Sequence, residues 1–417
     1  MREAPRNRWS TWALRACLIY YLLYGLPHLL SMLPGVSGVG EWWGTLLDGV
    51  AHWMIIAVLG LPEHSPTPPA WYLDHRGDSL AELVGCVATV TIALIASTAW
   101  TAMRTGNTRD ERRYAWLDAL VRFTFAGIML SYGWAKILPQ QFNGGQVPPS
   151  WLLWRVGDLS PQHLLWILMG FSRPYAIFSG AAEMVGALLV CSRRTATLGA
   201  LLSTGVLSNV VMMNMAYDVP VKVFAANLLL MAIFIAARDA DRLKAFVLGR
   251  PVPAVPPPPR LVGSKRLGRV AAVGLTFWLL IRPLPDVADN IGGLRLGRRP
   301  SPAYGGVFEV QQPEDVSKST PSNWPPAANW RRVVLTGRSA VVRTDTDSEM
   351  IYRLAADSGT GRLTFTGPDP NEKTVSFRYS MPDPAHLLLV PKEQDTVRLL
   401  LRRTDMTLLR WRHFWRW

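Results

Sequence analysis

Cysteine is scarce in this chain of 417 residues, which contains only Cys17, Cys86 and Cys191. Each lies within an apolar run, and no two of them form a CxxC motif. A thiol–disulfide carrier needs paired thiols that its substrate can reach. The sequence therefore argues against thiol–disulfide exchange and favours small, buried core residues at all three positions.

The motifs of common catalytic and metal sites are also missing. There is no HExxH, no phosphate-binding loop of the Walker type, and no GxSxG between a strand and a helix. The seven histidines are scattered along the chain. We therefore assign no catalytic residue and no metal ligand, and favour a protein that is not an enzyme. A haem or metal site formed by His28, His52 and His64 is the alternative.

Acidic residues are outnumbered, with 30 Asp and Glu against 44 Lys and Arg and a net charge of +14. Such a charge is compatible with nucleic-acid binding, but the basic residues cluster in short segments between long apolar runs. That pattern is typical of the loops of a membrane protein, whereas a nucleic-acid site needs a soluble basic face. We therefore expect a lipid bilayer, and no nucleic acid, as partner.

Seven apolar runs approach the roughly 20 residues that a helix needs to cross a bilayer. The first has a basic flank and indicates a retained signal-anchor helix; the last is short. The runs are 11–33, 79–103, 116–138, 174–191, 195–216, 220–237 and 267–283. Segment 41–61 mixes polar with apolar residues and predicts an interfacial or re-entrant helix, and 162–171 predicts a short interfacial one.

Loop charge predicts the orientation of these helices. Basic residues concentrate at the N-terminus, in 104–113, at Arg193 and Arg194, and in 238–266, whereas the opposite loops hold few. The positive-inside rule then places the N-terminus in the cytoplasm, with the chain in a bacterial inner membrane. Seven crossings make the C-terminal domain extracytoplasmic, and it lies inside if 267–283 does not cross.

The pattern changes after residue 300. Short runs such as "NWRRVVLTG" and "GRLTFTG" alternate apolar and polar residues between turn signals, which predicts about eight antiparallel strands. The expected fold is an α-helical polytopic membrane protein with a C-terminal all-β sandwich or small barrel. The expected parts are N-terminal helices (1–110), a four-helix membrane bundle (111–249), a proline-rich linker (250–266), a seventh transmembrane helix (267–285) and an extramembrane β-domain (300–417).

Ionisable residues inside apolar runs are costly and are candidates for function. Glu183 lies in the middle of its run, where a carboxylate must be protonated, paired or reached by water. Its alternative role is a hydrogen bond that packs two helices; Lys136 could equally extend to the interface, and Asp218 could cap a helix. Depth alone suggests one polar pocket that opens outward, lined by Tyr132, Lys136, Glu183, Asn209, Asn214, Tyr217, Asp218, Lys222 and Asn227.

Residues 116–248 resemble the DoxX-like family of bacterial membrane proteins. The resemblance is carried by "RFTFAGIMLSYGWAKILPQQF" and by "FSGAAEMVGALLVCSRRTATLGALLSTGVLSNVVMMNMAYDVPVK", at the positions Arg122, Gly133, Lys136, Gly180, Glu183, Gly186, Arg193 and Arg194. It implies a four-helix membrane bundle and, for some members, an association with quinone-linked or thiol-linked oxidation. The lack of paired cysteines departs from the thiol-using relatives.

Two functional hypotheses follow. The first is a membrane-anchored binding or accessory protein of the cell envelope, whose β-domain binds a ligand or an envelope protein. The basic, aromatic end "LLRWRHFWRW" would then contact anionic lipid head groups or form a last strand. The alternative is a component of a quinone-linked membrane oxidoreductase with a redox partner. There a quinone would lie near Glu183, which relays a proton, while Lys136 or Tyr132 holds a carbonyl oxygen.

Overall fold

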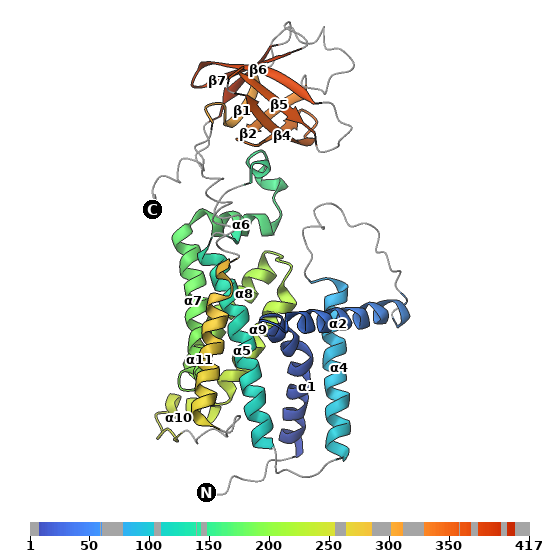
Figure 1. The fold of residues 1–417 in the computed structure, drawn as a ribbon, viewed down its shortest axis with the longest axis vertical. Helices are drawn as coiled ribbons and strands as arrows, with labels where there is room; N and C mark the ends of the chain where they lie inside the picture. Colours follow the sequence, from blue (N-terminus) through green and yellow to red (C-terminus); the bar gives the residue numbers. More distant parts are fainter. Residues whose placement is uncertain are drawn as a thin grey trace. The chain divides into compact units, whose positions relative to one another are not determined.

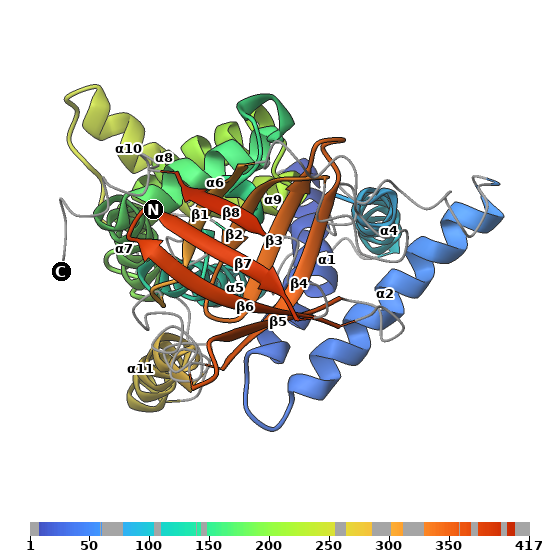
Figure 2. The ribbon, with the colours of Figure 1, turned by 90° about the horizontal axis from the view of Figure 1, so that it is seen from above.

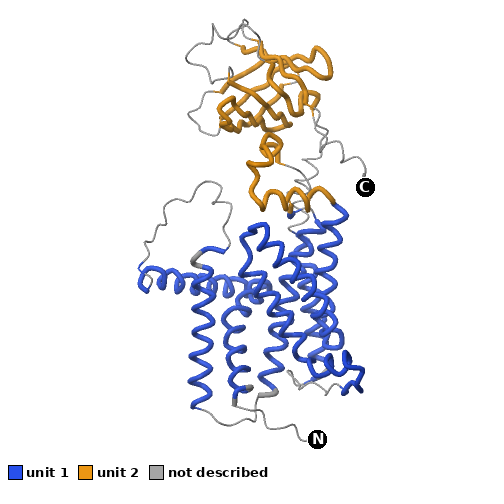
Figure 3. Tube along the Cα trace, turned by 180° about the vertical axis from the view of Figure 1, so that it is seen from behind, with its two compact units in different colours: residues 1–141, 173–288 blue, residues 142–172, 289–417 orange. Residues whose placement is uncertain are grey.

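The computed structural model describes the chain in two compact units (Figures 1 and 3). The helical unit comprises residues 1–141 and 173–288, and the barrel unit comprises 142–172 and 289–417. The described residues are all those outside 1–7, 59, 61–77, 104–109, 139, 143–147, 255–263, 286–301, 312–328, 358, 368–373, 393–397 and 405–417. His64, most of the proline-rich linker and the end "LLRWRHFWRW" lie outside the described residues.

The helical unit is built from apolar helices that run along one another, with one helix lying across them (Figures 1 and 2). Their bounds are α1 Arg8–Ser31, α2 Ser37–Ala57, α4 Leu80–Met103, α5 Asp110–Ile137, α7 Arg173–Cys191, α8 Ala196–Ala216, α9 Lys222–Ala237, α10 Ala240–Val247 and α11 Lys265–Ile281. The core surrounds α5, in which Phe125 and Leu130 are fully buried. Helix α5 packs most extensively on α7 and also contacts α1, α9 and α11.

The expected count of seven membrane spans is wrong. Four described helices are long and apolar enough to cross a bilayer, and α9 with α10 adds a fifth if that pair, bent by 72°, is one span. The four are Thr11–Ser31, Glu82–Met103, Arg173–Cys191 and Ala196–Ala216. Helix α11 has only 17 residues, about 26 Å at 1.5 Å per residue, against a hydrocarbon core of about 30 Å. Helix α5 is long enough but carries Asp118, Arg122 and Lys136.

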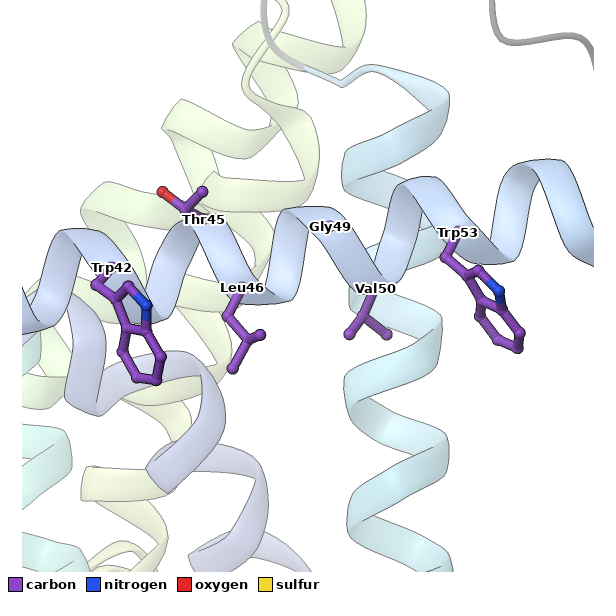
Figure 4. A pocket seen from close by; sticks show the side chains of 6 residues that line it. All are labelled: Trp42, Thr45, Leu46, Gly49, Val50 and Trp53. Atoms are coloured by element: carbon purple, nitrogen blue, oxygen red, sulfur yellow. The ribbon is translucent and has the colours of Figure 1, made fainter.

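Helix α2 crosses α1 and α4 rather than running beside them, and extends beyond α4 (Figures 1 and 2). It is held closely to α1, because a Cβ on Gly40 would lie 2.6 Å from the carbonyl oxygen of Pro27. Figure 4 shows Trp42, Leu46, Val50 and Trp53 on one side of α2 and Thr45 on the other. Both tryptophans are largely exposed. Such a two-sided helix is typical of the membrane interface.

The C-terminal domain is a closed barrel of eight antiparallel strands, which confirms the predicted β-domain and selects the barrel over the sandwich. The strands are β1 Gly306–Gln311, β2 Trp330–Leu335, β3 Ser339–Thr344, β4 Glu349–Asp357, β5 Arg362–Thr366, β6 Val375–Asp383, β7 His386–Pro391 and β8 Leu399–Arg403. Each pairs with the next, and β8 closes on β1, with Val310 opposite Leu401. Alternate residues face inward, so Leu387 and Leu389 are buried.

Side chains fill the barrel interior. Phe308, Leu363, Phe365, Phe377 and Leu401 are at most 1% exposed and belong to one apolar cluster. Eight strands enclose a space that side chains can fill. The barrel core is therefore a packed interior, and any binding by this domain would use its outer surface or its loops.

Candidate functional site

A buried ion pair lies between α5 and α7. The ammonium of Lys136 donates a hydrogen bond to Oε1 of Glu183, and the two side chains are 7% and 3% exposed. Lys136 therefore does not extend to an interface; it points into the bundle. Removing two charges from water is costly, and mutual attraction offsets that cost only when the remaining polar atoms are also satisfied.

The second carboxylate oxygen of Glu183 does not take part in the ion pair. Oε2 of Glu183 is buried and has no hydrogen-bond partner among the described residues. A buried carboxylate oxygen without a donor costs free energy comparable to a lost hydrogen bond, or more because it is charged. Such an atom in a helix that could cross a membrane marks a place where a ligand or a proton would be stabilised.

Two glycines bring the backbones of α5 and α7 close enough for the pair. A Cβ on Gly180 would lie 2.6 Å from the carbonyl oxygen of Gly133 and 2.9 Å from the Cβ of Lys136. A Cβ on Gly133 would lie 2.8 Å from the carbonyl oxygen of Gly180 and would overlap Met184. Small residues in facing positions are the usual means of close helix packing in membranes. The first glycine of the "GxxExxG" pattern of α7 thus packs against α5, whereas the second, Gly186, packs against α8, where a Cβ would overlap Oγ of Ser203.

A group of aromatic and polar side chains lies among α1, α5 and α9, and Tyr132 connects it to the ion pair. Tyr20 and Tyr24 of α1 stack with ring centroids 5.6 Å apart, and Tyr132 of α5 lies 5.9 Å from Phe224 of α9. The Tyr20 hydroxyl donates to Asn227 and also interacts with the thiol of Cys86. The Tyr132 hydroxyl lies within electrostatic range of the carboxylates of Glu183 and Glu82. We call this group the tyrosine cluster: Tyr20, Tyr24, Tyr132, Phe224 and Asn227.

The other predicted pocket residues are distributed over separate places. Asn209 is exposed and donates to Sδ of Met213. Asn214 is buried, and its Nδ2 has no partner among the described residues. Tyr217 is half-buried at the end of α8. The structure thus pairs Lys136 with Glu183 and joins Asn227 to the tyrosines, but brings Asn209 into neither group.

Asp218 and Lys222 form a second polar group at the start of α9. The Lys222 ammonium lies 2.6 Å from Asp218 and 3.4 Å from Asp78, which precedes α4. Asp78 also accepts the backbone N–H groups of Lys222 and Val223, at 2.8 and 3.0 Å. Asp78, in the segment before α4, therefore caps the N-terminus of α9. The sequence offered no signal for this contact, because Asp78 and Lys222 are 144 positions apart.

A basic cluster surrounds one carboxylate at the other end of the helical unit. Asp118 lies 3.3 Å from Arg122, 3.5 Å from Arg193 and 3.4 Å from Arg238. Arg122 also donates to the carbonyl oxygens of Val190, at 2.8 Å, and Cys191, which end α7. Arginines at a helix C-terminus satisfy carbonyls that have no helical donor. We call Asp118, Arg122, Arg193 and Arg238 the arginine cluster.

In the barrel unit, residues 150–158 pack on the barrel. Leu153 is fully buried in a cluster with Val307, Val334 and Val341. Polar contacts surround it: Nη2 of Arg343 lies 2.8 Å from Asp158, and Nε1 of Trp154 donates to Glu349 at 2.6 Å. The segment 150–158, which includes the short helices η2 (Ser150–Leu152) and η3 (Val156–Asp158), is therefore part of the barrel unit.

The charge of Asp158 is stabilised in this interface. The backbone N–H of Arg155 donates to it at 2.9 Å, and this bond together with the Arg343 guanidinium lowers the pKa of Asp158 below its ordinary value. The carboxylate therefore favours packing of the segment at neutral pH.

Possible metal ligands do not converge in the part of the chain that is described. No group of three His, Cys, Asp or Glu residues there is close enough to hold a metal ion. His28 instead contacts the carbonyl oxygen of Tyr24 at 2.8 Å and lies 6.0 Å from the ring of Phe224. His28 thus adjoins the tyrosine cluster.

These features define a helical protein with candidate membrane spans and a C-terminal eight-stranded β-barrel. A stretch of 136 residues, 33% of this chain, is 26% identical to the uncharacterized protein YwoB of Bacillus subtilis (strain 168) and covers 85% of that protein. Models of known protein families give no match, and no solved structure matches. The relative is itself uncharacterized, so the similarity assigns no activity to this chain.

Proposed function

We propose that this chain is a DoxX-like integral membrane protein of the bacterial cell envelope, which anchors a binding domain on the extracytoplasmic side of the inner membrane. The observation that carries the proposal is the position of residues 142–172. This segment leaves the helical unit after α5 and re-enters it at α7, yet it belongs to the barrel unit. Helix α5 ends where α7 begins, since Arg173 donates to the carbonyl oxygen of Ile137 at 3.1 Å.

The opposite ends of α5 and α7 carry the arginine cluster. Asp118 and Arg122 lie near the start of α5, and Arg193 follows α7. Cytoplasmic ends of membrane helices hold most of the Arg and Lys. The barrel unit is joined to the other ends, so it lies on the extracytoplasmic side in this proposal. This reasoning starts from α7, and it requires α11, which connects α10 to the strands of the barrel, to cross the bilayer as well despite its 17 residues.

The helical unit has a second role in this proposal, which is to bind the polar group of a small, lipid-soluble molecule beside Glu183. A hydroxyl or N–H group of the ligand would donate to Oε2 of Glu183, the buried oxygen that has no partner among the described residues. The ammonium of Lys136 stays with Oε1. The apolar faces of α5 and α7 would contact the rest of the ligand.

Mass spectrometry of molecules extracted from gently purified protein tests this binding role. Wild-type protein should retain a specific small molecule, and Glu183→Gln should lose it, because the amide replaces one acceptor oxygen by a donor. Glu309→Gln on the barrel surface is the matched control and should retain the molecule. Only bulk phospholipid in all three samples would refute ligand binding at Glu183 and leave the helical unit as an anchor.

A quinone-linked oxidoreductase component is the second candidate, favoured by the tyrosine cluster. Its phenol hydroxyls belong to α1 and α5, and that of Tyr132 lies within electrostatic range of both Glu183 and Glu82. Phenols can donate hydrogen bonds to quinone carbonyls, and Glu183 could exchange a proton with the reduced ring. A quinone in the extract of the wild type, lost in Tyr132→Phe and in Glu183→Gln, would select this candidate; a retained molecule that is not a quinone would exclude it.

A further inference from the structure

The arginine cluster holds more positive than negative charge. Three guanidinium groups lie within 3.5 Å of the single carboxylate of Asp118, which is 4% exposed at its side chain. Arginines are always charged in proteins, so the four side chains together carry two uncompensated positive charges. Charges that are partly removed from water need counter-charges or hydrogen-bond acceptors nearby.

The three arginines differ in how many of their N–H donors have an acceptor within the protein. Arg122 is 3% exposed, and it donates to Val190, Cys191 and Asp118. Arg193 and Arg238 each have one ion-pair contact within the described part of the chain, at 3.5 and 3.4 Å. They are 25% and 18% exposed. Each guanidinium has five N–H donors, so most donors of these two remain for an acceptor that reaches them from outside.

The cluster lies where a membrane surface is expected. Arg238 ends α9, and the chain then bends by 72° into α10. Helix α10 carries Lys244 beside Phe246 and Val247, which are 74% and 79% exposed. A short helix with exposed apolar and basic residues suits the boundary between acyl chains and head groups. The exposed side chains of Leu198 and Leu201, on α8, supply apolar surface for acyl chains.

We propose that Arg193 and Arg238 bind the phosphate of an anionic phospholipid, with Arg122 and Asp118 holding the two guanidinium groups in place. Guanidinium groups match phosphate oxygens in a bidentate geometry and are weakly hydrated, which suits a half-buried site. The surplus positive charge selects a lipid with net negative charge over a zwitterionic one, whose cationic group it would repel. This site is separate from Glu183 and is independent of the ligand proposed there.

The test is thermal unfolding of the full chain in an uncharged detergent, with phosphatidylglycerol, with phosphatidylcholine of the same acyl chains, or with inorganic phosphate. Phosphatidylglycerol should raise the midpoint temperature in a saturable way, and the other two should not. In the double variant Arg193→Gln/Arg238→Gln the apparent Kd for phosphatidylglycerol should rise about 25-fold, since each basic residue near a lipid surface contributes about fivefold. Arg194→Gln, an exposed neighbour with the same charge loss, should keep the wild-type Kd.

Several outcomes would overturn the proposal. Equal stabilisation by phosphatidylcholine would show that the charge of the head group is not recognised. Equal stabilisation by inorganic phosphate would show a site for free anions instead of a lipid. An unchanged Kd in the double variant would remove Arg193 and Arg238 from the site. If the double variant does not fold, the comparison of the three additives on the wild type still decides, together with the two single variants.

Discussion

Separating Lys136 from Glu183 should be far more damaging than removing both. Lys136→Met leaves a carboxylate that is 3% exposed without its partner, and Glu183→Leu leaves an ammonium that is 7% exposed without its own. Breaking a buried pair in this way costs about 3–5 kcal/mol, whereas replacing both members by apolar residues of similar size is often neutral or stabilising. The free energy of unfolding of the double variant Lys136→Met/Glu183→Leu should therefore be no more than about 1 kcal/mol below that of the wild type, or should exceed it.

The assay is equilibrium unfolding of the full chain in mixed micelles, followed by the helical circular dichroism signal over increasing denaturing detergent. With single losses of about 3–5 kcal/mol each and a double loss of about 1 kcal/mol or less, the coupling energy of the double-mutant cycle should be at least about 5 kcal/mol. Lys222→Met is the control, because that ammonium is 24% exposed and its partners Asp218 and Asp78 are 66% and 16% exposed, so this pair is more accessible to water than Lys136–Glu183 and should contribute less. If the two single losses simply add in the double variant, the buried pair described here does not govern the stability of α5 against α7.

The remaining predictions concern packing and pH. Gly180→Ala should cost about 1–3 kcal/mol by separating α7 from α5, while Gly205→Ala, where a Cβ meets nothing within 4 Å, should be neutral or stabilising in the same assay. Leu153→Ala should cost the barrel unit about 2–5 kcal/mol, seen as faster hydrogen exchange in β2 and β3, whereas Leu164→Ala at a 40% exposed position should not. Asp158→Asn should speed exchange in 150–158 at pH 7. Because the folded pKa of Asp158 is lowered, its stabilisation is complete above the ordinary value of 3.8 and disappears as pH falls through the folded value, where variant and wild type should exchange alike.

The β-domain was predictable because its signal is local. Burial alternates along a strand such as β7, in which Leu387 and Leu389 face inward. Alternating apolar residues over so short a stretch can be recognised in the sequence itself. Closure of the sheet is not local, since β1 and β8 pair over about 90 intervening residues. The sequence therefore predicted strands and left sandwich and barrel open.

The span count failed because hydropathy treats each helix alone. Helix α5 carries Asp118, Arg122 and Lys136, and all three are buried against other helices. Their partners lie far along the chain: Glu183 is 47 positions from Lys136, and Arg238 is 120 positions from Asp118. The position of Arg193 and Arg238 in basic loops indicates topology. It does not indicate that both contact Asp118.

The predicted pocket grouped residues that do not lie together in the structure. Depth in the membrane was inferred from position in each run, and it grouped Glu183 with Asn209. Depth does not fix the face of a helix that a residue occupies, and Asn209 is exposed while Glu183 is buried. The signal that could have separated them is the two glycines that flank Glu183, because Gly180 packs closely on α5 and Gly186 packs closely on α8.

The side of the membrane on which the barrel lies is the most direct measurement. Cysteines are placed singly at two exposed positions, Arg353→Cys on β4 and Arg194→Cys after α7, in a chain whose three natural cysteines are replaced by alanine. A maleimide that cannot cross membranes is applied to intact spheroplasts and to lysed ones. The proposal predicts labelling of Arg353→Cys in intact spheroplasts and of Arg194→Cys only after lysis. Labelling of Arg194→Cys in intact spheroplasts, with Arg353→Cys protected until lysis, would contradict it.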